Sequence, residues 1–168
     1  MPLLIQVSKF KDLTLKIEMV PEPLWNTNLR YLLTNKKWQE IRKHELKRIR
    51  NEQYQHCCEI CTRQKDVLDC HEIWGYDDEN RIQTLLGLIM LCKQCHLLKH
   101  IGFSSGLALE GKCNFDGLIR HFCHINKLTP ADFYEHYKEE FAKWEERSKH
   151  NDWKQNLKYI IESKMELF

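Results

Sequence analysis

Apolar residues alternate with polar ones near the start of the chain. Within residues 3–19 the alternation is clearest at Leu13, Leu15, Ile17 and Met19. A period of two is that of a strand with one buried face, so we expect strands in this segment. The run Pro21-Glu22-Pro23 ends the pattern, and a short connection completes an N-terminal part that covers residues 1–34.

Three later segments have the 3.6-residue period of a helix. The first begins at a cap, Asn35, and runs to about Tyr54. The second covers Phe115 to Lys127. The third runs from Thr129 to about Ser148 and starts with a cap, a proline and an acidic residue. Its apolar stripe consists of Phe133, Tyr137, Phe141 and Trp144.

Between the first two helices lies a segment of mixed pattern, residues 56–102. It predicts a strand from Val67 to Trp74 and a partner strand from Leu88 to Leu91. A polar loop over Gly75–Arg81 joins them, with a helical turn at Arg81–Leu86. From Cys95 to about Gly102 the pattern is helical again.

The remaining segments complete the expected fold. Glycines predict a loop over residues 103–114, and alternation at Leu157, Tyr159 and Ile161 predicts a last strand. The fold class is therefore α+β in a single domain. Its parts are N-terminal strands (1–34), a helix (35–54), a mixed segment (56–102) and C-terminal helices with a final strand (103–168).

Composition and length indicate in which compartment the protein works and how its cysteines are used. The chain has 168 residues, ordinary apolar and charged fractions, and a formal charge of +2, which by itself does not indicate nucleic acid. No apolar run is long enough to span a bilayer, and the N-terminus lacks the basic start of a signal peptide. We therefore expect a cytoplasmic protein without membrane contact, in which eight cysteines serve better as metal ligands than as disulfides.

Charge is unevenly distributed, and the predicted helix 35–54 is its most basic part. Residues 36–50 contain seven basic and two acidic side chains, which gives this segment a net charge of +5. Such a face is either simply solvated or contacts phosphates. The candidate nucleic-acid contacts are Lys43, Lys47, Arg48 and Arg50.

Two Cys-x-x-Cys pairs are the strongest chemical signal. Zinc prefers four thiolate or imidazole ligands in a tetrahedron, and a two-residue gap lets one tight turn present two thiolates. Cys58, Cys61, Cys92 and Cys95 have this spacing. They predict a structural zinc site. Two histidines farther along, His121 and His124, have no third ligand nearby, so we expect them to be ordinary helix residues.

A second group of metal-capable residues surrounds these cysteines. It comprises the run Leu68-Asp69-Cys70-His71-Glu72-Ile73 and the pair His96 and His100. Together with the cysteine pairs, this stretch resembles the HNH endonucleases, the zinc-containing branch of the ββα-metal nucleases. The wider run, including Trp74-Gly75-Tyr76-Asp77-Asp78 and Lys99-His100-Ile101-Gly102, is similar to a bacterial subgroup of HNH-like proteins.

The resemblance implies a ββα-metal finger that hydrolyses phosphodiester bonds of DNA with one divalent ion, Mg²⁺, Mn²⁺ or another. Family members carry a metal ligand and a histidine base next to each other on the first strand. One alignment makes His71 a metal ligand and puts Glu72 at the base position. The other makes His71 the base and puts Cys70 at the ligand position. Both keep His96 as the ligand from the helix.

We favour the first alignment, with His71 and His96 as ligands and Glu72 as base. His100 is either a third ligand or a helix residue that hydrogen-bonds nearby. The family's middle asparagine would fall at Gly87 and is absent. The sequence therefore favours an HNH-type endonuclease. The alternative is a catalytically inactive zinc module that binds nucleic acid or a protein partner.

Overall fold

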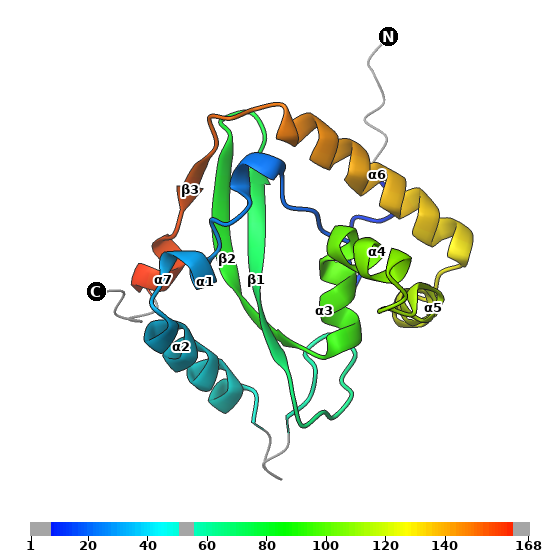
Figure 1. The fold of residues 1–168 in the computed structure, drawn as a ribbon, viewed down its shortest axis with the longest axis horizontal. Coiled ribbons are helices and arrows are strands. Elements are labelled where there is room, and N and C mark those ends of the chain that lie inside the picture. The colour runs from blue at the N-terminus through cyan, green and yellow to red at the C-terminus, as the bar shows by residue number, and fades with distance from the viewer. Residues whose placement is uncertain (1–7, 51–55, 163–168) are drawn as a thin grey trace.

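The structure, a computed structural model, describes residues 8–50 and 56–162, the last two by their backbone alone. It is an α+β fold in which a three-stranded sheet, ordered β1-β2-β3, is surrounded by helices (Figure 1). The elements are α1 (Leu29–Leu32), α2 (Asn35–Arg48), β1 (Asp69–Asp77), β2 (Ile82–Leu91), α3 (Lys93–Lys99), α4 (Ile101–Leu109), α5 (Phe115–Asn126), α6 (Pro130–Ser148), β3 (Lys154–Asn156) and α7 (Lys158–Glu162).

The centre of the fold is a long antiparallel hairpin made by β1 and β2. Its register pairs Asp69 with Leu91 at one end and Asp77 with Ile82 at the other, with an irregularity between Ile73 and Trp74. The expected strands are therefore confirmed, but both are longer than predicted. The helical turn expected at Arg81–Leu86 is wrong, because alternate burial of the β-forming residues in β2 favours a strand.

The two faces of the hairpin meet different helices. Successive side chains of a strand point to opposite faces. His71 contacts histidine rings of α3 and its C-cap, whereas the next residue, Glu72, accepts a hydrogen bond from the backbone N–H of Leu29 in α1. In Figure 1, α2 and α3 accordingly flank the hairpin on its two sides. This division decides which predicted site residues can meet.

The N-terminal strand prediction is wrong for the described residues 8–20, and residues 3–7 lie outside the described part. The segment has a turn at residues 9–12 and no regular secondary structure after it; Leu15 and Ile17 are fully buried, but helix side chains take the place of a partner strand. Asn126 accepts from the N–H of Leu15 at 3.1 Å and donates to its carbonyl at 2.8 Å. His136 Nε2 accepts from the N–H of Ile17 at 3.1 Å.

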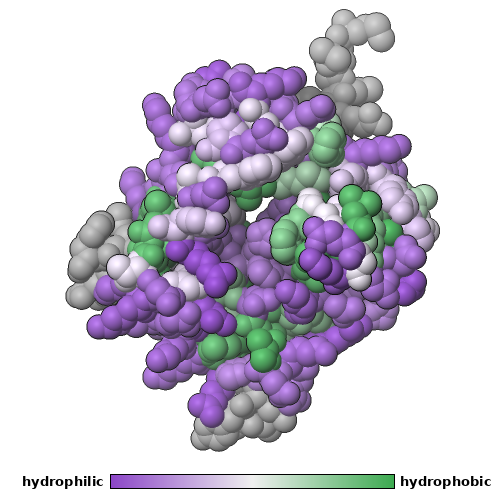
Figure 2. Space-filling view, viewed as in Figure 1, coloured by the Kyte–Doolittle hydropathy of each residue, from purple (hydrophilic) through white to green (hydrophobic). Residues whose placement is uncertain are grey.

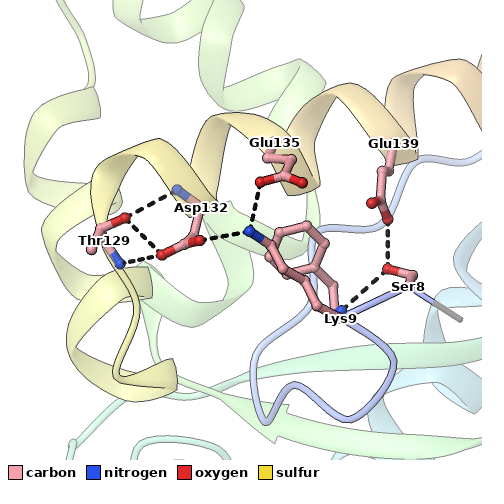
Figure 3. A network of polar contacts seen from close by, with 7 residues as sticks. Ser8, Lys9, Thr129, Asp132, Glu135 and Glu139 are labelled. Atoms are coloured by element: carbon pink, nitrogen blue, oxygen red, sulfur yellow. Dashed lines mark hydrogen bonds and ion pairs between the residues drawn. The ribbon is translucent and has the colours of Figure 1, made fainter. Parts of the chain in front are cut away.

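Helix α6 confirms the third helical prediction and anchors the start of the described chain. Thr129 and Asp132 form a capping box, in which each side chain accepts a bond from the other's backbone N–H. Figure 3 shows that Asp132 also meets Lys9, whose ammonium lies 2.9 Å from it and 2.6 Å from Glu135. Ser8 donates to Glu139 one turn further along. Because ion pairs at the surface add little to the free energy of folding, these contacts chiefly fix how residues 8–9 lie along α6.

Other element boundaries differ from prediction. Helix α2 is capped by Thr34, whose side chain accepts from the N–H of Lys37, rather than by Asn35; it ends at Arg48, and the predicted end at Tyr54 lies outside the described residues. The loop expected over 103–114 is mostly helix α4. The predicted last strand is wrong, because β3 ends at Asn156 and residues 158–162 form α7. Helix α5 confirms the prediction for Phe115 to Lys127.

Candidate metal centres

The four predicted zinc ligands lie together at the end of the hairpin. Cys58 and Cys61 flank a turn before β1, while Cys92 caps α3 and Cys95 lies in its first turn. Their sulfur atoms all lie within 4.8 Å of one another, and Cys61 Sγ is 3.7 Å from Cys92 Sγ. Four sulfurs around a tetrahedral zinc with Zn–S bonds of about 2.3 Å are separated by nearly the same distance as Cys61 Sγ and Cys92 Sγ. The cluster can hold a structural metal ion such as zinc.

Local bonds hold the first cysteine turn against the hairpin. The N–H of Thr62 donates to the carbonyl of Cys58 at 2.9 Å, and Thr62 takes the positive φ of 58° that the tight turn needs. Glu59 joins this turn to β2: its N–H donates to the carbonyl of Met90 and its carboxylate accepts from the N–H of Met90. The two-residue spacing within each pair and these hydrogen bonds together bring the two cysteine pairs into contact.

The thiols interact strongly with one another. Hydrogen bonds from Cys92 and Cys95 lower the pKa of Cys58, and the same contact with Cys58 raises the pKa of Cys95. Burial raises the pKa of Cys61 to about 11. One sulfur thus takes the negative charge that its neighbours stabilise. A divalent cation would stabilise the thiolate form of all four sulfurs.

His121 on α5 lies next to this cluster, a role that the sequence prediction missed. Its Nε2 is 3.2 Å from Cys95 Sγ, and burial lowers its pKa, so that the ring is neutral and can donate one hydrogen bond to a thiolate. Such bonds orient metal ligands and disperse their charge. No spacing rule could have found this contact, because 26 residues separate the partners.

The second predicted group also comes together. His71 from β1, His96 from α3 and His100 at the end of α3 offer nitrogens that lie within 4.8 Å of one another. Their ring centroids are 4.7–5.4 Å apart, and the rings meet edge to face. This arrangement groups His100 with the other two rings. We call these three residues the histidine cluster.

His71 carries an orphaned polar atom. The residue is 7% exposed, and its Nε2 is buried without a hydrogen-bond partner. The nearest carboxylate oxygen is that of Glu18, 3.6 Å away, while the other oxygen of Glu18 binds Lys99 at 2.6 Å. Burial raises the pKa of Glu18, but the His71 and Lys99 contacts outweigh it and lower the pKa to about 2. Glu18 is therefore ionised at neutral pH.

The contacts and pKa values of His96 and His100 favour the binding of a cation. Asp69 lies 3.1 Å from His96 Nδ1, which leaves His96 Nε2 for a ligand, as in the carboxylate–histidine pairs of known metal sites. Burial first, then the neighbouring His71, lowers the pKa of His96, against the opposing effect of Asp69. His100 is the exposed member of the cluster, but partial desolvation of its ring, followed by His71 and His96, lowers its pKa to about 3. Neutral imidazoles are the form that binds metals.

The predicted base, Glu72, does not join the histidine cluster. One of its oxygens accepts from the N–H of Leu29 at 2.7 Å, and the other accepts from the indole N–H of Trp74 at 3.0 Å. Burial raises its pKa, and these two bonds oppose that effect. Cys70, the ligand in the alternative alignment, is also outside the cluster. Burial raises its pKa to about 12, which keeps it a thiol.

The basic residues of α2 lie on the other side of the hairpin from the histidines. Arg48 donates to both oxygens of Glu59 at 2.8 Å and to Glu45 at 2.7 Å, and these hydrogen bonds, that to Glu59 most, raise its pKa. Its guanidinium therefore connects α2 to the turn between Cys58 and Cys61. Lys43, Lys47 and Arg50 are exposed. The structure does not bring them to the histidine cluster.

A cavity of about 750 Å³ opens beside the histidine cluster. Its walls come from the segment 18–30, the edge strand β1, the α3–α4 junction and one side of α6. Figure 2 shows an opening near the middle of the corresponding face. The volume falls in the range of about 300–1,000 Å³ that is typical of ligand sites. The histidines therefore face a space that a substrate can enter.

No protein-family model, curated protein or solved structure matches this chain. Among the helices of residues 8–50 and 56–162, none is long and apolar enough to cross a membrane. Function therefore has to be inferred from the two clusters and the cavity.

Proposed function

We propose that the protein is a metal-dependent HNH-type endonuclease that hydrolyses phosphodiester bonds of DNA and carries a structural zinc at its four cysteines. The observation that supports it is the convergence of the histidine cluster from the first strand of a hairpin and the following helix. The four-cysteine cluster lies at the base of the same strand–strand–helix unit. This order of elements and ligands is the one that the sequence resemblance implies.

In this proposal the histidine cluster holds the second ion through three imidazole nitrogens. The ion would neutralise charge on the scissile phosphate and its leaving oxygen and lower the pKa of water. Imidazoles favour ions such as Zn²⁺ or Ni²⁺ over Mg²⁺ and Mn²⁺, which prefer oxygen ligands. Asp69 orients His96, and the orphaned Nε2 of His71 gains a partner.

Glu18 and Lys99 complete the charged surroundings. Among the described residues, Glu18 and Asp69 are the carboxylates within 4.0 Å of a cluster nitrogen. Since Asp69 is engaged with His96, Glu18 is the acidic group in position to orient the attacking water. Lys99 holds Glu18 in place through the 2.6 Å contact and adds positive charge for a phosphate.

Metal analysis and a plasmid assay test the proposal. Purified protein should contain tightly bound zinc and should nick supercoiled DNA when Mn²⁺, Ni²⁺ or Zn²⁺ is added. His71→Ala and His96→Ala should abolish nicking and keep the zinc of the cysteine cluster. The matched control is His124→Ala, an exposed histidine outside both clusters, which should cut normally. Equal nicking by wild type and His71→Ala would refute the proposal and indicate a contaminating nuclease.

The second candidate function is an inactive zinc module that binds nucleic acid or a protein partner. It is favoured by the position of Glu72, whose two oxygens are both used in structural hydrogen bonds. In that case DNA would be retained without cleavage. Lys43→Glu and Lys47→Glu should then weaken retention and reduce its salt dependence, with a log–log slope that is smaller by about 1 for each lysine replaced. Arg48→Ala should mainly destabilise the fold.

A further inference from the structure

The aromatic stripe of α6 has the spacing of a core-facing helix side, but only its first member is fully buried. Phe133 has no exposed surface, whereas Tyr137, Phe141 and Trp144 line the cavity that contains the histidine cluster. Their rings form a continuous series: Tyr137 and Phe141 are nearly parallel at 13°, and Phe141 and Trp144 have centroids 5.2 Å apart. One wall of the cavity that contains the histidine cluster is therefore aromatic.

Two tryptophans at this cavity are held by one backbone atom. Trp25 Nε1 and Trp144 Nε1 both donate to the carbonyl of Val20, at 2.9 Å and 3.1 Å. Their polar atoms are thus satisfied within the protein, and their ring faces remain for other contacts. Trp25 is 56% exposed and Phe141 is 40% exposed, so these faces are accessible. Rings that are already fixed lose little entropy when a ligand stacks on them.

The polar lining of the cavity is mixed. Arg30 and Lys99 are balanced by Glu18 and Glu72, Lys99 is paired with Glu18 at 2.6 Å, and Asn26, Asn28 and Gln155 supply amides. Aromatic faces that stack bases are what single-stranded nucleic-acid sites share, and a cation at the histidine cluster would supply the positive charge for the adjoining phosphate. A paired base inside a duplex presents no free face to such a wall.

We propose that this cavity binds an unpaired nucleobase of single-stranded nucleic acid, stacked on Phe141 and its aromatic neighbours, so that the adjoining phosphate lies at the histidine cluster. This inference rests on the proposed endonuclease function and specifies its substrate: a single strand, or an unpaired position in a duplex.

The test measures binding without cleavage. A labelled single-stranded oligonucleotide and a hairpin duplex of the same composition are titrated into the full-length His71→Ala protein, and fluorescence anisotropy gives the dissociation constants. The single strand should bind more tightly than the duplex. Adding Phe141→Ala should weaken single-strand binding on the order of 5-fold to 100-fold, the usual loss when one stacking ring is removed. The single strand should also quench tryptophan fluorescence.

The matched control is Tyr134→Ala in the same His71→Ala protein. Tyr134 is an aromatic residue of α6 that is 50% exposed and does not line the cavity, so binding should be unchanged. Tighter binding of the duplex, or equal binding with and without Phe141, would overturn the inference while nicking by wild-type protein still supports the endonuclease. Selective binding of the single strand without any cleavage in wild type would instead refute the endonuclease and keep the binding site.

Discussion

His71 and Glu72 are neighbours in the chain and yet serve opposite faces of β1. His71 meets the histidines of α3, and Glu72 meets the backbone of α1. The period of two along a strand causes this separation. It changes the interpretation of the ligand–base pair that the resemblance implies: the acidic group beside the histidines is Glu18, from a segment more than fifty residues earlier.

The first prediction concerns the role of Glu72. Glu72→Ala should leave the N–H of Leu29 and the indole N–H of Trp74 without acceptors, which costs about 1–3 kcal/mol of unfolding free energy. Metal binding at the histidines should persist. Urea denaturation gives the first quantity and calorimetric titration with Ni²⁺ the second. Loss of nicking in Glu72→Gln with normal Ni²⁺ affinity would restore Glu72 as a catalytic base.

A second prediction follows from the lowered pKa of His100. The unfolded chain protonates this ring below the ordinary value of 6.5, whereas the folded protein does so only near 3. Because the unfolded state then binds more protons, stability should fall as the pH falls through this window. Protein that carries only the structural zinc should lose thermal stability between about pH 6.5 and pH 5, and His100→Gln should lose less. Identical pH profiles would contradict the assignment.

At this scale the sequence predicted both metal-capable groups and missed the side chains from other segments that surround them. The cysteine spacing and the His96–His100 spacing are properties of single turns, so they were visible without a structure. Glu18 at the histidines and His121 at Cys95 depend on how distant segments pack. No local pattern records that packing.

At the scale of elements, the irregular segment before α1 shows why periodicity alone misleads. Its alternation is real, since Leu15 and Ile17 are buried, but its hydrogen bonds come from Asn126 and His136 on helices. Helix α4 shows the reverse error. Gly102 and Gly106 suggested a loop, yet a Cβ at either position would meet nothing, so they are exposed helix positions that tolerate glycine.

A third prediction tests these helix contacts. Asn126→Ala should leave the N–H and carbonyl of Leu15 without partners and lower the unfolding free energy by about 1–3 kcal/mol. Asn126→Asp keeps the acceptor and removes the donor, so it should destabilise the protein less. Denaturant unfolding of both variants measures the difference. Equal stability of all three proteins would show that the segment is held by apolar burial alone.

At the scale of the whole molecule, the four-cysteine cluster adds a connection between parts that backbone and side-chain hydrogen bonds already join. It connects the turn at Cys58 to β2 and α3, and Arg48 links α2 to the same turn through Glu59. The α+β class and most helices were predictable, because they follow from periodicity and caps. The sheet order and β3 were not, since parallel pairing of β3 with β2 joins segments 72 residues apart.

The fourth prediction is that removing a metal ion from the four-cysteine cluster loosens this whole arrangement. A strong chelator should lower the melting temperature by more than 10 °C, roughly the effect of several kcal/mol in a domain of this size. Zinc should restore it, and Cys95→Ser should behave like the chelated protein. His121→Ala should weaken zinc retention by about 10-fold or more while all four thiolates remain. An unchanged melting temperature after complete zinc loss would contradict this view.

Residues 56–102 contain every cysteine and histidine of the two clusters, which suggests that this segment could be transferred to another protein with its function. The position of Glu18 argues against such a transfer. The Glu18 carboxylate, the aromatic wall and the helix side chains that hold the N-terminal segment all come from outside those residues. The segment 56–102 alone should still bind metal at its four cysteines but lose the carboxylate and the aromatic wall beside the histidines. A minimal unit with the complete site must therefore include the N-terminal segment together with α5 and α6.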